Sequence, residues 1–533
     1  MAPQSTIILN LRQTSVVFGN PKSLCPILKR LSHYATHDID EAEHLWYARY
    51  NHVNRKVVYL AARRKEVAMT GQKNVLYGVL DGKYVTITRG EGAYVYDDAG
   101  KRYLDAASGV CVVNVGHGVP EILEAMSRQA SQLAFTYGGL VDNQPRQELA
   151  AKLQEWAPAG MGETKTLFVS GGAEANEAAL KIAYQYHWER GHATRRRVIG
   201  RWQSYHGNTI ATLSMSGRTT WREMAGVLLM DFPHIPPPYC YRCPWNQSYP
   251  GCGLPCAHEL RRVIRQEGPE SIAAFIAEPV IGTSLSAVVP PPEYYPIIRE
   301  ICDEFDVLFI ADEVMSGVGR TGEKWGIDNW GVTPDIITSS KGLAGGYAPL
   351  GAAILRDKVW KPIAAGSNNV LHSCTYGGNP LSCAVAVAVL DYIEANNLVT
   401  RAGEMGDRLL AKLRHKLATN PYVGDIRGKG LFAGIELVRD RESKKPFPVE
   451  MDLGLQIELE AIRRGVILLA GVTGLVDGIA GDHLELVPPY TIEDEHIDFL
   501  TRRFLPCRHL VFVRLDHEKA KRLKIFTYNL FID

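Results

Sequence analysis

The chain of 533 residues is long enough for about two to four domains with ample cores. Its 59 basic and 58 acidic side chains leave a formal net charge of +1, which argues against nucleic acid or an anionic membrane as the main partner. Apolar residues make up 46% of the chain, yet the longest apolar runs, such as 465–476, contain glycines and are too short to cross a bilayer.

Cysteine usage and the N-terminal composition bear on the cellular compartment. Ten cysteines are too few for a disulfide scaffold, so we expect a reducing, intracellular environment and, first of all, the cytoplasm. The first acidic residue is Asp38, and Arg12, Lys22, Lys29 and Arg30 precede it among several Ser and Thr. This acid-poor start resembles an organellar presequence, which makes the mitochondrial matrix the alternative; a plain tail would look the same.

Residues 1–72 read as an N-terminal extension, with helical spacing only in 41–65. The pattern changes in the next segment, 73–125. There, residues 84–108 alternate apolar and polar side chains around two glycine-containing turns, which predicts a meander of short antiparallel strands. We assign 73–125 to the first part of a small domain.

Between 126 and 370, strand-like runs alternate with helical stretches. Most of these runs are apolar throughout and rich in β-branched residues, as expected of strands that are covered on both faces. The alternation predicts a large α/β domain around a mainly parallel sheet. The strand candidates are 166–169, 197–201, 272–278, 307–312, 335–340 and 351–355.

The segment 371–500 is mixed in character. A buried-looking helix, "LSCAVAVAVLDYIEANNL", follows Pro380, and "VGDIRGKGLFAGIEL" (423–437) restarts a strand pattern. We therefore expect a smaller α+β domain here. Residues 501–533 carry no motif and stay an unassigned tail.

A single charged residue, Lys341, stands in "TSSKGLAGGYAPLGA" (338–352), directly after a predicted strand. Ligands of open α/β sheets bind just past the carboxyl ends of the strands. A lysine held partly desolvated at such a place has a lowered pKa and can attack a carbonyl, so we expect Lys341 to form a Schiff base. The alternative is a surface lysine in a glycine-rich loop.

Asp312 ends the preceding apolar strand, 29 residues before Lys341. On adjacent strands, the two side chains would face the same crevice. Pyridoxal phosphate needs such a pair, because a lysine holds its aldehyde and a carboxylate keeps its pyridine nitrogen protonated. Alternatively, Asp312 caps the next turn.

Two further segments fit the same cofactor. "VSGGAEANEAALKIAYQYH", from Val169, leads from a strand through glycines into a helix, whose N-terminus can bind a phosphate. "QSYHGNT" (203–209) offers Tyr205 as a flat face for the cofactor ring, although an ordinary core tyrosine would look the same.

In order along the chain, these motifs resemble those of the class III pyridoxal-phosphate-dependent aminotransferases, the group of the ornithine, 4-aminobutyrate and ω-amino acid:pyruvate enzymes. The resemblance covers about 78–500. "ADEVMSGVGRTG" followed by the lysine segment is its most specific part, supported by "SGGAEANEAALKIA", "YHGNT", "AEPV", "TYGGNPLSCA" and "GDHLELVPPY". It implies fold type I, with a large cofactor domain (126–370) around a mainly parallel, seven-stranded-type sheet, and a smaller α+β domain.

The resemblance also implies roles for individual residues. Lys341 would form the Schiff base and move the proton at the substrate's Cα. Asp312 would bind the pyridine nitrogen, with Val314 under the ring and Tyr205 stacked over it. Glu278, in "AEPV", would lie near the ring and the substrate.

The phosphate would be bound at the glycine turn by Gly171, Gly172 and Ala173, the last two through their N–H groups. Thr375 would reach the phosphate of the neighbouring subunit. Because this places the site at a subunit interface, the resemblance implies a homodimer.

The chain departs from the family pattern in several places. Many relatives have Ser at Ala173 and Gln at Met315, so a hydroxyl contact and a hydrogen bond to the cofactor are lost. The segment 474–490 contains no arginine, although relatives commonly bind the substrate carboxylate from there. No residue is therefore assigned to the substrate carboxylate at this point, and we interpret Arg320 and Arg427 as structural.

Four cysteines cluster as C-x2-C-x8-C-x3-C in "YCYRCPWNQSYPGCGLPC": Cys240, Cys243, Cys252 and Cys256. Such spacing suits a structural zinc ion, but reduced cysteines packed with Pro and Tyr are the alternative, and we assign no metal.

The sequence thus favours an aminotransferase that moves nitrogen from an amine or amino acid donor to a keto acid in ping-pong order. The same cofactor could instead support an aminomutase, a racemase or a decarboxylating transaminase. A non-catalytic scaffold is the remaining alternative, and the Lys341–Asp312 pair argues against it.

Overall fold

A computed structural model describes residues 8–11, 14–17, 74–78, 84–471 and 473–504. The chain divides into two units, Met1–Val85 and Thr86–Asp533. In the first, β1 (Ile8–Leu11) and β2 (Thr14–Val17) pair as an antiparallel hairpin. The rest of the predicted extension 1–72, including its helical stretch, and residues 505–533 of the tail lie outside the described residues.

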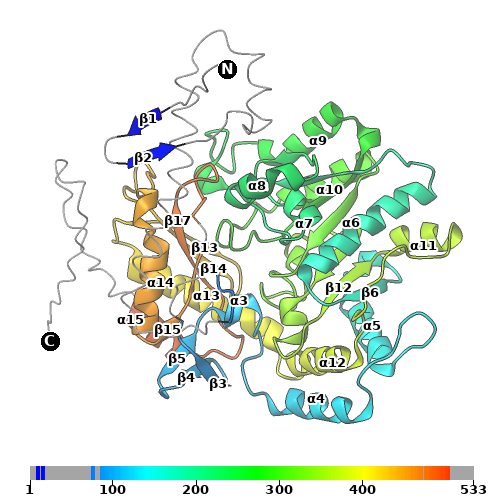
Figure 1. Ribbon diagram of the computed structural model, residues 1–533, viewed down its shortest axis with the longest axis horizontal. Helices are drawn as coiled ribbons and strands as arrows, with labels where there is room; N and C mark the ends of the chain where they lie inside the picture. Colours follow the sequence, from blue (N-terminus) through cyan, green and yellow to red (C-terminus); the bar gives the residue numbers. More distant parts are fainter. Residues whose placement is uncertain (1–7, 12–13, 18–73, 79–83, 472, 505–533) are drawn as a thin grey trace, which may run out of the picture. The chain divides into compact units, whose positions relative to one another are not determined.

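A seven-stranded sheet forms the centre of the second unit (Figure 1). Every neighbouring pair is parallel except those of β12, which runs antiparallel to β6 and β11. All six predicted strands are present, and the mainly parallel α/β class is confirmed. Only the two-residue β8 was not predicted. Along the sheet the order is β6 (Lys165–Val169), β12 (Gly351–Leu355), β11 (Ile336–Ser339), β10 (Leu308–Asp312), β9 (Ile272–Ala277), β7 (Arg197–Arg201) and β8 (His234–Ile235).

The central strands are apolar throughout because helices cover both faces of the sheet. Phe275 and Phe309 point into one hydrophobic cluster, while their neighbours Ile276 and Ile310 point into another. These alternating positions explain why β9 and β10 lack the polar residues of a half-exposed strand. The helices of this part are α4 (Pro120–Gln132), α5 (Gln144–Trp156), α6 (Gly172–Glu189), α7 (Ile210–Met215), α8 (Thr219–Ala225), α9 (Pro255–Glu267), α10 (Tyr294–Glu304), α11 (Asp357–Ala365) and α12 (Pro380–Ala395).

A smaller α+β part combines residues from before and after the large sheet. The predicted meander is confirmed as β3 (Ile87–Glu91), β4 (Tyr94–Asp97) and β5 (Arg102–Asp105), and β15 (Val466–Ile467) joins it in parallel with β5. A second, antiparallel sheet has the order β13-β14-β17-β16. Its strands are β13 (Val423–Gly428), β14 (Ala433–Leu437), β17 (Asp482–Leu486) and β16 (Leu469–Ala470), and the accompanying helices are α13 (Leu398–Leu417), α14 (Leu453–Arg463) and α15 (Asp494–Phe504).

Among the described helices, none alone has the length and hydropathy of a membrane span; α12 and α13 meet that test only as a pair bent by 65°.

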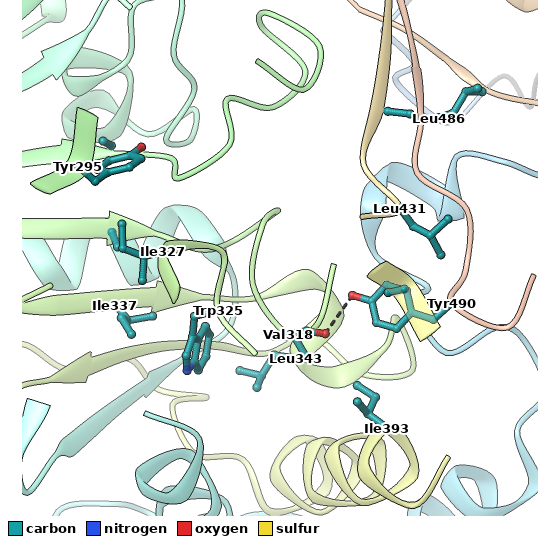
Figure 2. Close-up of a cluster of buried hydrophobic side chains, with 14 of the residues drawn as sticks. Tyr295, Val318, Trp325, Ile327, Ile337, Leu343, Ile393, Leu431, Leu486 and Tyr490 are labelled. Carbon is teal, nitrogen blue, oxygen red and sulfur yellow. Dashed lines mark hydrogen bonds between the residues drawn. The ribbon is translucent and has the colours of Figure 1, made fainter. Parts of the chain in front are cut away.

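Buried side chains fix the loops that follow β10 and β11 (Figure 2). Tyr490 donates its hydroxyl to the carbonyl of Val318 at 3.0 Å, and Trp325 donates its indole N–H to the carbonyl of Trp156 at 2.9 Å. Leu343, two residues after Lys341, is fully buried in the same cluster. The segments that present functional side chains are therefore held on a rigid, well-packed base.

Candidate functional site

Lys341 and Asp312 lie at the ends of two adjacent parallel strands. In the register of β10 and β11, Asp312 is opposite Thr338, three residues before Lys341. The backbone of Lys341 has φ = 45°, in the left-handed region that non-glycine residues rarely adopt, at a cost of about 1–3 kcal/mol. A strained residue at the edge of a parallel sheet is typical of a functional site.

The surroundings of Lys341 favour its neutral amine. Burial lowers its pKa, and the nearby Cys111, Glu485, Asp312 and Glu278 oppose that shift without cancelling it. Within the described part of the chain, its amine makes no hydrogen bond or ion pair. The amine is therefore free to act as a nucleophile or as a proton carrier.

Asp312 is buried and held by three donors. His206 Nδ1 lies 2.7 Å from its Oδ2, Asn176 donates to the same oxygen at 2.9 Å, and the N–H of Val314 donates to Oδ1 at 3.1 Å. Asn176 is itself oriented by Thr338, which donates to its amide oxygen at 2.7 Å. This network fixes the carboxylate in one orientation, as a partner for a cationic nitrogen requires.

The predicted phosphate site is the N-terminus of α6. Gly171 is extended (φ = −168°), and no side chain in the described part of the chain caps the helix, so the first-turn N–H groups of Gly172 and Ala173 have no acceptor within the helix. Gly172 lies against Val314: a Cβ at this glycine would be 2.9 Å from Val314 Cγ1. The turn thus brings Val314, from the loop after β10, directly to the helix start.

Tyr205 and Glu278 lie on the far side of Asp312 along the sheet, after β7 and β9. The half-buried ring of Tyr205 meets Trp221 edge-on at 5.6 Å. Glu278 is buried, and burial raises the pKa of its carboxyl. The N–H of Tyr205 points to its Oε1 at 3.4 Å, while Arg201 is 3.7 Å from its Oε2.

Thr375 is exposed in the single chain. Its neighbour Cys374 lies 3.5 Å from the hydroxyl of Ser170, just before α6. The loop that carries Thr375 therefore borders the predicted phosphate site, and its reach into a second subunit stays a prediction.

The polar atoms around Lys341 fit a bound ligand with several polar groups. Three of the described side chains here have buried polar atoms without a hydrogen-bond partner: His206 (Nε2), Glu278 (Oε2) and Glu485 (both carboxylate oxygens). The hydroxyl of Thr283 lies near Glu485 and lowers the pKa of its carboxyl. Glu278 and Glu485 are close enough to act on the charge of Lys341, and His206 contacts Asp312, so these atoms lie around the Lys341–Asp312 pair. Together, the amine of Lys341, the carboxylate of Asp312 and the uncapped N-terminus of α6 suit the aldehyde, the ring nitrogen and the phosphate of pyridoxal phosphate.

Four residues at this site were not assigned a role from the sequence: Asn176, His206, Arg218 and Glu485. Asn176 and His206 stand inside the quoted motifs, so their positions were visible but their contact with Asp312 was not. That contact joins residues 106 and 136 positions apart. Glu485 also stands inside a quoted motif, "GDHLELVPPY", but its position beside Lys341 was not visible, and Arg218 lies outside the quoted motifs.

Arg320 and Arg427 are bonded to distant parts of the chain. Arg320 donates to the carbonyls of Leu431 and Pro488 at 2.9 and 2.6 Å, and Arg427 pairs with Glu436 at 2.9 Å. Both arginines thus hold the chain together, in line with the structural interpretation.

The four clustered cysteines are free thiols around a small cavity of about 20 Å³. Within the described residues, no three metal-binding atoms of this group lie within 4.8 Å of one another. A tetrahedral zinc site needs four ligands at about 2.3 Å from the ion, so this geometry is not a preformed zinc centre.

The chain is similar to known proteins over most of its length. The profile of the aminotransferase class-III family matches residues 79–507. YodT of Bacillus subtilis, described as an uncharacterized aminotransferase, is 38% identical over 80% of this chain and 95% of its own. The putrescine–pyruvate aminotransferase of Pseudomonas aeruginosa is 35% identical over 78% and 88% of the two chains. In structure, an (S)-enantioselective ω-transaminase from Thermomicrobium roseum superposes with a TM-score of 0.75 at 38% identity, over 84% and 97% of the chains.

Proposed function

This chain belongs to the class-III aminotransferase family and is a transaminase, and we propose that it moves an amino group from an amine or amino acid to a keto acid in ping-pong order, with pyridoxal phosphate attached to Lys341. The observation that carries this assignment is the pairing of a half-buried lysine, whose amine makes no hydrogen bond within the described residues, with a fixed carboxylate at the ends of neighbouring strands.

Pyridoxal phosphate, when bound, supplies an aldehyde for amines and a ring that delocalises negative charge from the substrate carbon. Lys341 would hold it covalently, Asp312 would face its ring nitrogen, and Tyr205 and Val314 would confine its plane. The N–H groups of Gly172 and Ala173 would bind its phosphate.

Lys341 has the properties of the proton carrier. Burial lowers its pKa, so a larger fraction of the amine is neutral and can take a proton from the substrate's Cα. Its lack of hydrogen bonds leaves Nζ free to return that proton at a second atom. Asp312 stays in place during the transfer because three donors hold it.

The homodimer is part of the proposal. An exposed apolar surface, here called the interface patch, comprises Phe135, Tyr137, Leu140 and Tyr376. Its two loops are joined by Asn143, which donates to the carbonyl of Gly378 at 3.0 Å. Exposed apolar patches of this kind mark protein–protein contacts, and this patch adjoins Thr375, the residue proposed to reach the partner's cofactor.

The test combines spectroscopy with product analysis. Purified protein should gain an absorption band near the visible edge with pyridoxal phosphate, and should release ketone from a panel of amines with pyruvate or 2-oxoglutarate. Lys341→Ala should lose the band and lower turnover by about 10²- to 10⁴-fold or more. Asp391→Ala, an exposed change on α12, should leave both intact.

Two results would contradict the proposal. An isomer in place of ketone would indicate an aminomutase or a racemase, and carbon dioxide released together with the carbonyl product would indicate a decarboxylating transaminase. Wild-type protein that binds no cofactor would leave only the scaffold alternative.

A further inference from the structure

The guanidinium of Arg218 lies beside the proposed cofactor site and forms no ion pair with any described acidic residue. Its Cζ lies 4.9 Å from the ring centroid of Tyr205 and 4.4 Å from that of Trp221. Within the described residues it makes no hydrogen bond and no ion pair, although Glu278 and Glu485 are close enough to act on its charge. The two aromatic rings thus fix the plane of the group and leave its N–H donors free.

A small cavity of about 20 Å³ opens at this arginine. Its wall joins three distant segments, represented by Arg218, Ser284 and Thr473. Ser284 is only 5% exposed, and its hydroxyl is buried without a hydrogen-bond partner. About 10–15 Å³ is enough to hold one water, so the cavity admits a small polar group.

The cavity needs an acceptor with a negative charge. The guanidinium offers only donors, in a planar fork that matches a carboxylate, and the hydroxyl of Ser284 can donate as well. A neutral or cationic group would leave the charge of Arg218 unpaired. Because Arg218 contacts Tyr205, a group held here also lies next to the ring that would cover the cofactor.

We propose that Arg218, with Ser284, binds the carboxylate of the amino acid or keto acid substrate. This assignment rests on the proposed function and adds to it a preference for carboxylated substrates. It also explains how the chain binds a carboxylate without an arginine in 474–490: Gly474 and Gly478 of that segment line the same cavity as Arg218.

The test compares substrates with and without a carboxylate on the holoenzyme. For Arg218→Met, the ratio of kcat/KM for pyruvate to that for propanal should fall about 10- to 100-fold, because a charge-assisted pair is lost. The effect should appear mainly in KM for pyruvate. Arg218→Lys should restore part of the ratio, and Ser284→Ala should lower it less than Arg218→Met.

Binding without turnover provides a second readout. Calorimetry should show that propionate binds the wild type more tightly than propionamide does, and that Arg218→Met removes this difference. Arg222→Met is the matched control: its guanidinium, four residues on, bonds to the carbonyls of Leu213 and Ser214, so the ratio and the difference should persist.

The outcomes separate the two levels of the proposal. If Arg218→Met lowers the rates with pyruvate and propanal equally, or if propionate binding is unchanged, Arg218 is structural and the proposal is overturned. A wild type that turns over neither acceptor refutes the transamination itself, and propionate binding then still reports on Arg218.

Discussion

On the scale of single residues, the orientation of Asp312 depends on His206. Nδ1 of His206 and Oδ2 of Asp312 are 2.7 Å apart, and neither side chain is more than 3% exposed. A hydrogen bond to a charged group contributes about 1.5–3 kcal/mol, so its loss is worth about 10- to 100-fold in rate. His206 is thus a positioning residue that acts through the carboxylate.

We predict that His206→Ala lowers kcat by about 10- to 100-fold and shifts its pH profile, because Asp312 then holds the ring nitrogen's proton less well. Steady-state kinetics across pH measure both effects. His187 is an equally buried histidine, bonded to the carbonyl of Ala273 at 2.9 Å. His187→Ala should reduce stability and leave the pH profile of the folded enzyme as it was; equal profiles for the two variants would contradict the role of His206.

Glu485 predicts a pH dependence of stability. Burial raises its pKa from 4.5 to about 7. Between these values the folded state keeps a proton that the unfolded state has lost, so its stabilising contribution is present below pH 4.5 and is lost as the pH rises to 7. The difference is about 3 kcal/mol.

We therefore expect Glu485→Gln to unfold at a higher temperature than the wild type at pH 8 and to show little advantage at pH 5. Thermal unfolding at a series of pH values checks this. The exposed Glu163→Gln should follow the wild type at every pH. If the unfolding temperatures of the wild type and of Glu485→Gln changed in parallel with pH, Glu485 would be charged at every pH tested.

On the scale of elements, two strand ends and one helix start build the site. β10 presents Asp312, Lys341 is the second residue after β11, and α6 begins with free N–H groups beside Val314. Parallel strands bring their carboxyl ends to one edge, and the glycine turn lets α6 start close to that edge.

The start of α6 gives a paired prediction. In Gly172→Ala the new Cβ would be 2.9 Å from the stiff Val314, so Val314 must move and we expect about tenfold weaker binding of pyridoxal phosphate. At Gly171 a Cβ meets nothing within 4 Å and the backbone is extended, so Gly171→Ala should weaken binding less. Fluorescence titration of the cofactor measures both; equal losses would show that Val314 is not the reason.

On the scale of the whole molecule, the interface patch bears on assembly. Leu140 is 94% exposed and Tyr376 63% exposed, which is unusual for side chains of this size. Burial of such groups against a second copy would bring Thr375 toward the partner's site and complete it.

We predict that Tyr376→Glu shifts the protein from dimer to monomer and lowers activity with it, because charge is introduced into an apolar contact. Analytical ultracentrifugation and turnover on the same sample test this. Tyr422→Glu, at an aromatic residue of the smaller part, should stay dimeric. A monomeric wild type, or a dimeric and active Tyr376→Glu, would place the contact elsewhere.

The sequence by itself determined the fold class, the six main strands, and the Lys341–Asp312 pair. These follow from local signals, because runs of apolar residues, glycine turns and motif spacing depend on neighbours along the chain. The predicted boundaries between domains, the compartment and the roles of the single cofactor residues stay predictions.

Only the tertiary structure decided which side chains support that pair. It brought His206 and Asn176 to Asp312, placed Glu485 beside Lys341, and set Arg218 against Ser284 and the segment 473–478. These contacts join residues from tens to hundreds of positions apart. No periodicity or spacing encodes them, because they arise where strands, helices and loops from both parts of the fold close around one site.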